Sequence, residues 1–225
     1  GAKDQPTAFY FQLNNGKFRN KTFSFSQEDS IYEDMDILLF DADNDGDNDC
    51  YIVSGGNEFD IDSPYLVDRL YINDGKGNLI KSSNSIPSNF SSGMRVSAND
   101  FDKDGDLDLF VGGRVVPGSY PLPADSNLLI NESSGKEVKF SNADSSIFPF
   151  SDIGLVSSSV WTDYNNDSWD DLIVVGEWMP IKFYKNIQGK FIEDKSFIDS
   201  DSTNGWWYDV ISEDFDQDGD MDLVV

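Results

Sequence analysis

The chain has 225 residues, of which 42 are acidic and 16 are basic, and its formal net charge is −26. This balance excludes nucleic acid as a partner, because phosphate binding needs clustered Lys and Arg. The chain has no histidine, which excludes imidazole base catalysis and the usual zinc or copper site, and its one cysteine, Cys50, excludes an internal disulfide. No stretch approaches the roughly 18 apolar residues of a transmembrane helix, so we expect no membrane insertion.

The first predicted element is a hairpin, in which an apolar run from Phe11 meets Asn14, turns at Gly16 and returns at Phe18. Alternating apolar residues with Asn and Gly turns are typical of antiparallel strands. The four Asn residues of this pattern are 59, 58 and 55 residues apart. The later copies of the pattern have Asn73, Asn131 and Asn186 in the place of Asn14.

Asp-rich loops of nine residues alternate with these hairpins, and each leads directly into a short apolar, β-prone run. Their first residues are 59, 63 and 51 residues apart. Together they hold 19 of the 42 acidic residues, so the negative charge is clustered rather than spread over a surface. The loops span residues 41–49, 100–108, 163–171 and 214–222, and we number them loops 1 to 4.

Each unit reads as strand, loop, strand and hairpin, and no long stretch has helical periodicity. Such units, repeated at roughly 40–60 residues, predict an all-β chain: a β-propeller of four-stranded antiparallel blades with about four repeats. Two arrangements remain open: a fragment of a larger propeller, which we favour, or a closed four-bladed ring completed by the N-terminal hairpin. We expect one domain over residues 1–225, with units at 1–30 (partial), 31–90, 91–150, 151–205 and 206–225 (partial).

The residue types and spacing within the loops predict calcium sites. Oxygen ligands at loop positions 1, 3 and 5 can point at one centre if the chain curls tightly, and Gly at position 6 permits that turn. Position 7 supplies a backbone carbonyl, and Asp at position 9 replaces the Glu at position 12 of an EF-hand. This many hard oxygen ligands favours Ca²⁺ over Mg²⁺. The predicted ligands are Asp41, Asp43, Asp45, Asp47, Asp49, Asp100, Asp102, Asp104, Asp106, Asp108, Asp163, Asn165, Asp167, Trp169, Asp171, Asp214, Asp216, Asp218, Asp220 and Asp222.

The third loop departs from this pattern. It has Asn165 instead of Asp at position 3, and Ser168 instead of Gly at position 6. Without a cation the packed carboxylates of such loops would repel one another. We therefore expect up to four Ca²⁺ sites, of which the third is the weakest.

With these loops in place, the chain resembles the FG-GAP/VCBS repeats, known from the propellers of integrin α-subunits and from many secreted bacterial proteins. The resemblance covers nearly the whole chain. Segments 106–121 and 175–180 are similar to the subgroup associated with ASPIC/UnbV domains, which includes cartilage acidic protein-like sequences. The resemblance implies a propeller, usually seven-bladed, with structural Ca²⁺ in the loops, but it implies no single activity.

Just past the strand that follows each loop, residues at equivalent positions differ in type from one unit to the next. Such variation on a repeated frame is expected of a binding face. For the arginine of this set we favour an ion pair to a neighbouring blade. We expect Trp161 and residues 206–208 to pack between blades, although such aromatic clusters can also stack on sugars or anchor a protein partner. The candidate ligand or partner face consists of Asn57, Glu58, Arg114, Glu177 and Trp178.

Three functions fit the sequence. The favoured one is an extracellular or cell-surface module, stabilised by calcium, that binds or adheres to a protein or a glycan. It is favoured because no catalytic set is visible and because extracellular calcium suits weak sites with dissociation constants of about 10⁻⁴–10⁻³ M. The alternatives are a polysaccharide-active, lyase-like enzyme, for which the sequence marks no catalytic residue, and a structural spacer of a larger surface protein.

Overall fold

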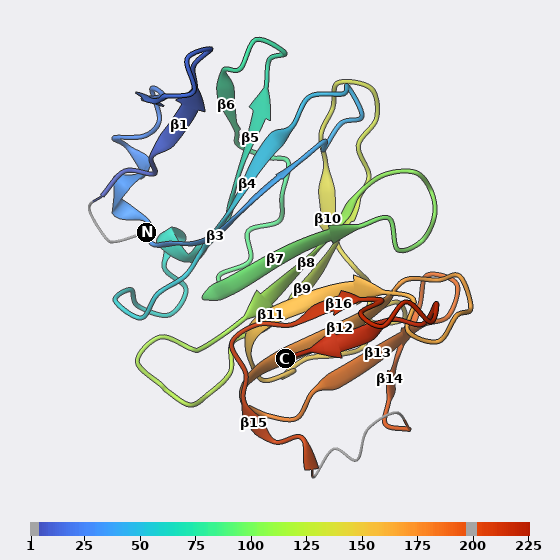
Figure 1. Cartoon of the computed structure of the whole chain (residues 1–225). Coiled ribbons are helices and arrows are strands. Elements are labelled where there is room, and N and C mark those ends of the chain that lie inside the picture. Colours follow the sequence, from blue (N-terminus) through green and yellow to red (C-terminus); the bar gives the residue numbers. More distant parts are fainter. Residues whose placement is uncertain (1–4, 197–201) are drawn as a thin grey trace.

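The structure is a computed structural model that describes residues 5–196 and 202–225. Three antiparallel sheets follow one another along the chain, and each pairs its strands in chain order (Figure 1). The first sheet consists of β3 (Asp34–Phe40), β4 (Asp49–Ser54), β5 (Arg69–Asn73) and β6 (Leu79–Ser82). The second consists of β7 (Gly93–Asn99), β8 (Asp108–Gly113), β9 (Asn127–Asn131) and β10 (Phe140–Asn142). The third consists of β11 (Leu155–Thr162), β12 (Asp171–Met179), β13 (Lys182–Asn186) and β14 (Phe191–Asp194).

Shorter elements accompany these sheets. The strand β15 (Gly205–Trp206) pairs with β12. It lies on the opposite side of β12 from β11, since Glu177 of β12 is paired with one residue of β11 and one of β15. Two separate hairpins lie at the ends of the chain: β1 (Phe9–Gln12) with β2 (Phe18–Lys21), and β16 (Ile211–Glu213) with β17 (Asp222–Val224). The described helices are single 3₁₀ turns at Asp29–Ile31 and Pro64–Leu66, and neither could span a bilayer.

The second strand of each sheet is buried along nearly its whole length because it packs on both faces. Alternation in β4 shows how. Tyr51 and Val53 belong to a core shared with the second sheet, whereas Cys50 and Ile52 point the other way, toward Phe23 and Phe25. This period of two is the pattern expected of a strand between two packed layers.

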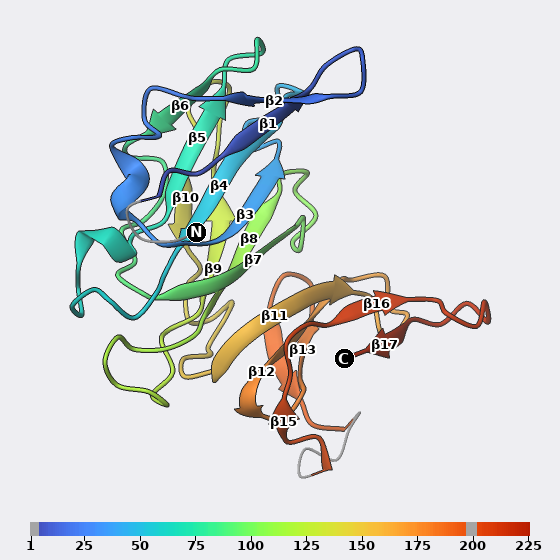
Figure 2. The ribbon, with the colours of Figure 1, turned by 60° about the vertical axis from the view of Figure 1, so that its left-hand side comes forward.

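The three sheets stack face to face as consecutive blades (Figure 2). One core lies between the first and second sheets and a second core between the second and third. The packing is close: a Cβ added at Gly112 would lie 2.5 Å from Cγ1 of Val156 in the next blade. The prediction of propeller-type, four-stranded antiparallel blades is confirmed.

The alternative of a closed four-bladed ring is wrong. The hairpin of β1 and β2 and that of β16 and β17 each form their own two-stranded sheet, and the described residues pair neither with the other. Phe9 of the first hairpin instead packs on the outer face of the first sheet, and β16 lies against β11 of the third. The blades therefore form an open arc.

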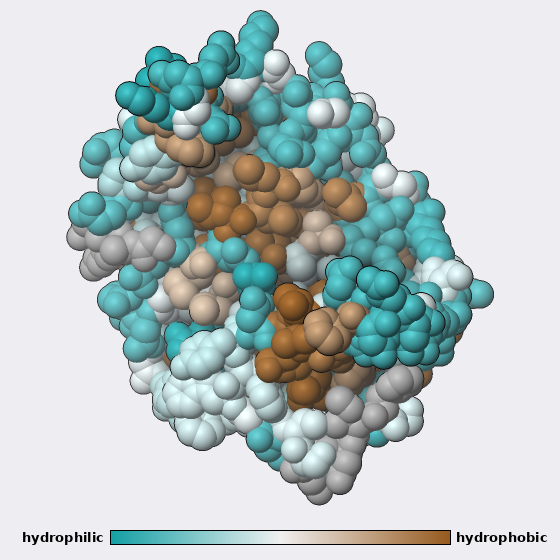
Figure 3. Space-filling view, in the orientation of Figure 1, coloured by the Kyte–Doolittle hydropathy of each residue, from teal (hydrophilic) through white to brown (hydrophobic). Residues whose placement is uncertain are grey.

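The open arc leaves apolar side chains uncovered. Figure 3 shows two apolar areas on one side of the molecule, one over the first sheet and one over the β16–β17 hairpin. Ile37 and Leu39 of β3 are 44% and 58% exposed, and Ile211 and Val224 of the C-terminal hairpin are similarly open.

Candidate metal loops and binding face

Each Asp-rich loop joins the first strand of a blade to the second, so that its position 9 is also the first residue of the second strand. The carboxylate at position 1 folds the loop around itself. In loop 1, Asp41 Oδ1 accepts the N–H of Asp45 at 3.1 Å and Oδ2 accepts the N–H of Gly46 at 2.9 Å. Loops 3 and 4 repeat both bonds, and loop 2 repeats the second. The loops are therefore one structural motif in four copies.

The tight turn depends on left-handed backbone at positions 4 and 6. Gly105 has φ +101°, which is open to glycine at no steric cost. Ser168 takes the same place in loop 3 with φ +71°, and Asn166 at position 4 has φ +57°. The substitution of Gly noted in the sequence therefore leaves the loop conformation unchanged, at some cost in backbone strain.

Carboxylates converge in three of the four loops. In each of these groups, one oxygen per residue lies within 4.8 Å of the others, close enough for a single cation. The groups are Asp41, Asp43 and Asp45; Asp100, Asp102 and Asp108; and Asp214, Asp216 and Asp218. Within the part of the chain that the structure describes, loop 3 has no such group, because Asn165 replaces the carboxylate at position 3. Three Asp-rich groups can thus hold a metal ion.

Whether the loops fit a cation can be judged from carboxylate oxygens that are buried without a hydrogen-bond partner. Among the described residues, Oδ1 of Asp43, Oδ1 of Asp100 and Oδ2 of Asp108 are buried and accept no hydrogen bond. Burying a charged oxygen unpaired is costly, and a bound cation would satisfy it. These atoms belong to loops 1 and 2, so the residues present there fit a hard cation. The carboxylates and position-7 carbonyls would hold it, and its positive charge would offset their repulsion.

The pKa values of the position-9 carboxyls differ between loops 2 and 3. Burial raises the pKa of Asp108 to about 8; the N–H of Asn131 opposes the rise, and the carboxylates of loop 2 add to it. Burial also raises the pKa of Asp171, but only to about 6, because the N–H of Asn186 and the amide of Asn165 both stabilise its charged form. Loop 2 therefore concentrates more uncompensated negative charge than loop 3.

The Asn that recurs in each hairpin has a role that the sequence reading missed. The backbone N–H of Asn131 donates to Oδ1 of Asp108 at 2.8 Å, which fixes the position-9 carboxylate. The side-chain amide of Asn131 donates to the carbonyl of Leu107 at 3.2 Å and to that of Ala42, in the loop of the preceding blade, at 3.1 Å. Asn131 therefore ties two successive loops together.

Asn186 repeats the arrangement one blade later. Its amide donates to the carbonyls of Asp170 and of Phe101, and its N–H to Asp171. The regular spacing of these Asn residues was the signal in the sequence that could have revealed a role beyond the turn.

Side chains at position 4 reach the next loop. Asn166 donates to Oδ1 of Asp220 at 2.8 Å, and the ammonium of Lys103 lies 4.4 Å from the ring centre of Trp169. The side chains at position 7 thus bridge blades, which is compatible with the predicted ligand role of the position-7 carbonyl.

The candidate face gathers at the other end of the second strands. Asn57, Glu58 and Arg114 line one cavity of about 300 Å³ between the first and second blades. Arg114 forms the predicted ion pair to the next blade: its Nη2 lies 2.6 Å from Oε1 of Glu177. Oδ1 of Asn57 accepts the N–H of Gly118 at 2.7 Å, so the loop after β8 crosses this face.

An aromatic cluster adjoins this ion pair. Trp178 is 62% exposed and has left-handed backbone (φ +58°), which is unusual for a bulky residue. Its Nε1 donates to the hydroxyl of Tyr120 at 2.5 Å, and that hydroxyl donates to Oε2 of Glu177 at 3.2 Å. The ring of Trp206 lies 4.7 Å from that of Trp178 and is roughly parallel to that of Tyr208, at an interplanar angle of 23°.

The expectation that all these aromatics are core is wrong in part. Trp161 packs against the core of the second and third blades, as predicted. Trp206 and Tyr208 are 44% and 77% exposed: Trp206 lies in the two-residue strand β15, which pairs only with the end of β12, and Tyr208 follows that strand.

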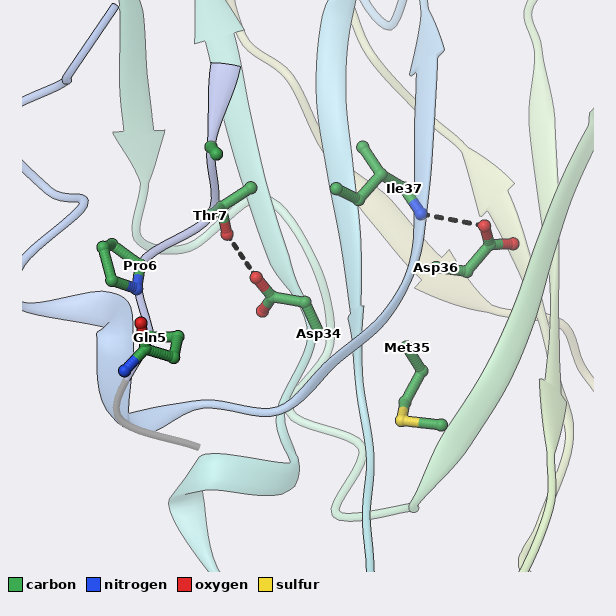
Figure 4. A pocket seen from close by; sticks show the side chains of 8 residues that line it. Gln5, Pro6, Thr7, Asp34, Met35, Asp36 and Ile37 are labelled. Carbon is green, nitrogen blue, oxygen red and sulfur yellow. Dashed lines mark hydrogen bonds between the residues drawn. The ribbon is translucent and has the colours of Figure 1, made fainter. Parts of the chain in front are cut away.

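A further pocket lies between residues 5–8 and the start of β3 (Figure 4). There Thr7 donates to the carboxylate of Asp34, and the N–H of Ile37 donates to Oδ1 of Asp36 at 2.9 Å. The Asp34 carboxylate is also paired with Arg69, so the polar groups of this pocket serve the fold.

Comparison with known families agrees with the repeats seen in the structure. No curated protein matches the chain at a significant level. A family model described as FG-GAP-like repeat matches twice, over residues 41–111 and 163–225, and these matches cover more than half of the chain. Each match begins at the first Asp of a loop. The chain belongs to the FG-GAP-like repeat family.

Proposed function

We propose that this protein is a calcium-stabilised binding module that acts outside the cell or at its surface and recognises a glycan. Ca²⁺ would bind in loops 1, 2 and 4, and the ligand would bind at the opposite end of the blades. The family supports an adhesion-type repeat module. The proposed site is the surface formed by Tyr120, Glu177, Trp178, Trp206 and Tyr208, which we call the aromatic face.

The observation that carries the proposal is the set of exposed rings beside a charged pair. Exposed aromatic rings offer flat apolar surfaces, and such rings can stack on sugar rings. Next to them, Glu177 and Arg114 provide hydrogen-bond acceptors and donors within one network. A few placed polar groups beside apolar surface are typical of small-ligand sites. The strained backbone of Trp178 points the same way, because such strain clusters at functional sites.

Calcium binding is tested first by thermal unfolding in excess Ca²⁺ and in chelator. A site that is filled only in the folded state, at 100 times its dissociation constant, adds about 2.7 kcal/mol. We expect several filled loops to raise the midpoint by many degrees. An unchanged midpoint would refute calcium stabilisation.

Ligand binding is tested on glycan and protein arrays run in calcium. We expect reproducible glycan binding that Trp178→Ala abolishes. The control is Tyr10→Ala, since Tyr10 is also 62% exposed but lies on the N-terminal hairpin. Binding to proteins alone would move the proposal to a protein partner. No binding at all would favour a structural spacer.

We propose binding without catalysis. Tyr120 and Arg114 are groups that a polysaccharide lyase without histidine could use, so the enzyme alternative has a defined test. Incubation with acidic polysaccharides and detection of unsaturated products by ultraviolet absorbance would reveal it, and we expect none. Assignment to the subgroup associated with ASPIC/UnbV domains also remains a proposal, supported by the motif at residues 175–180.

A further inference from the structure

Loop 3 has a lysine where the other loops have room for a cation. The Nζ of Lys185, in β13, lies 3.1 Å from Oδ2 of Asp167 and 3.4 Å from Oδ1 of Asn165. These two residues are at loop positions 5 and 3. The same two positions supply metal-holding carboxylates in loops 1 and 4.

Asn165 also contacts the position-9 carboxylate of loop 3. The Nδ2 of Asn165 donates to Oδ2 of Asp171 at 2.5 Å, so the position-9 carboxylate has a partner on both oxygens. In loop 2, by contrast, Oδ2 of Asp108 is buried without a partner among the described residues. No carboxylate oxygen of loop 3 is left in that condition within the described part of the chain.

Comparison of the blades shows that the lysine is particular to the third. The residue before the recurrent Asn is Ile72 in the first blade and Ile130 in the second. Both are partly buried against the apolar cores between blades. Lys185 takes the corresponding place in β13, paired with Ile192 of β14.

We propose that the ammonium of Lys185 is the resident cation of loop 3, so that this loop folds without metal and does not bind Ca²⁺. A divalent cation would have to displace the ammonium, and the site offers it one carboxylate fewer than the sites of loops 1 and 2. Charge repulsion between the ammonium and an incoming cation acts at a few ångströms and is weakly screened by salt. The inference rests on the proposed function in one respect: it contrasts loop 3 with loops that are proposed to bind calcium.

A metal-independent third loop has a consequence for the arc of blades. Loop 3 contacts loop 2 through Lys103 and loop 4 through Asn166. At low calcium, loops 1, 2 and 4 would carry uncompensated carboxylates, whereas loop 3 would keep its charge balanced between them.

The test converts loop 3 to the pattern of loop 1. The double variant Asn165→Asp/Lys185→Ile places at both positions the residue types of the first blade, Asp43 and Ile72. We expect it to bind one more Ca²⁺ per chain than the wild type, counted by equilibrium dialysis. Lys185→Arg keeps the positive charge and should gain none. A double variant that is folded, fills its other sites and gains no calcium would overturn the inference.

A second measurement holds even if the double variant does not fold. In the wild-type chain, Asp163→Asn should leave the calcium count unchanged, whereas Asp100→Asn should lower it by one. Loss of calcium in Asp163→Asn would overturn the Lys185 inference alone, whereas a wild type that binds no calcium at all would refute the proposed function.

Discussion

Loop 2 (residues 100–108) and loop 3 (residues 163–171) occupy the same place in neighbouring blades, between the first and second strands. Both fold around a position-1 carboxylate, and both are tied by an Asn amide to the loop of the preceding blade. They differ in how their negative charge is balanced. Loop 2 brings Asp100, Asp102 and Asp108 close enough together for a single cation, whereas loop 3 balances its charge with its own amide and Lys185.

The comparison separates two properties of a metal loop: its backbone conformation and its need for a cation. The backbone path follows from hydrogen bonds within the loop and from the Asn ties, because it is the same whether the carboxylates converge or not. The need for a cation follows only from the convergence of carboxylates, which is costly without a compensating charge. Variants of the two loops can therefore test each property separately.

The largest effect is expected from removing the position-9 charge in calcium. Asp108→Asn keeps the shape of the side chain and an acceptor for Asn131 but removes a metal ligand. With free Ca²⁺ at 100 times the dissociation constant, it should therefore lose about 2.7 kcal/mol of stability. Asp171→Asn should lose no calcium-dependent stability. Urea denaturation in Ca²⁺ and in chelator measures both. Equal calcium-dependent losses in the two variants would show that the loops bind calcium alike.

The Asn ties should matter equally in both loops. Asn131→Ala and Asn186→Ala each remove two donated bonds to carbonyls, one within the blade and one across blades. We expect each to cost about 2–3 kcal/mol in chelator, because buried carbonyls are left unpaired. The matched control is Asn73→Ala, which removes only the bond to Asn48 and the turn bonds, and should cost about 1 kcal/mol. A clearly smaller loss for Asn186→Ala than for Asn131→Ala would mean that the two scaffolds differ.

The sequence allowed the loops and the strand order to be predicted because both depend on short-range pattern. Nine residues contain the whole motif of Asp at alternate positions and a turn residue at position 6, and period-two alternation marks the strand that follows. The Asn ties depend on chain segments far apart: Asn131 and Ala42 are separated by 89 positions. No local pattern encodes such a contact.

The binding face was only partly predictable for a similar reason. Arg114, Glu177 and Trp178 were found because they vary on a repeated frame. Tyr120, which joins Trp178 to Glu177, lies in the connection from β8 to β9, outside the repeated loop and hairpin patterns, so the repeat gave no position for it. Lys185 was visible as a departure from Ile72 and Ile130, but its effect on loop 3 required the geometry.

The comparison also predicts that the two loops respond to different pH ranges in the metal-free protein. In chelator, the folded-state pKa values of Asp108 and Asp171 are about 8 and about 6, above the unfolded value. Each folded form therefore binds more protons than the unfolded chain, and its contribution to stability grows as pH falls through the folded pKa. Between pH 8 and 6 the gain comes mainly from Asp108 and is of the order of 1–2 kcal/mol.

Urea titrations in chelator at pH 8 and pH 6 measure this gain. Asp108→Asn should remove most of it, whereas Asp171→Asn should leave it nearly intact. A gain that survives in Asp108→Asn would show that the charge of loop 2 is already compensated without metal.

The smallest effect concerns the turn at position 6, where the two loops solve the same conformational problem with different residues. Both Gly105 and Ser168 have positive φ, and a Cβ added at Gly105 would meet no atom within 4 Å. The cost of a side chain there is therefore purely conformational, about 1 kcal/mol. Gly105→Ala should destabilise by about that amount and Ser168→Gly should stabilise by about 0.5–1 kcal/mol, less the entropy that glycine adds to the unfolded chain. Urea denaturation in chelator resolves the sign. If Ser168→Gly destabilised the protein, the serine side chain would be contributing contacts that the loop comparison does not account for, and the two loops would share less of their scaffold than their hydrogen bonds indicate.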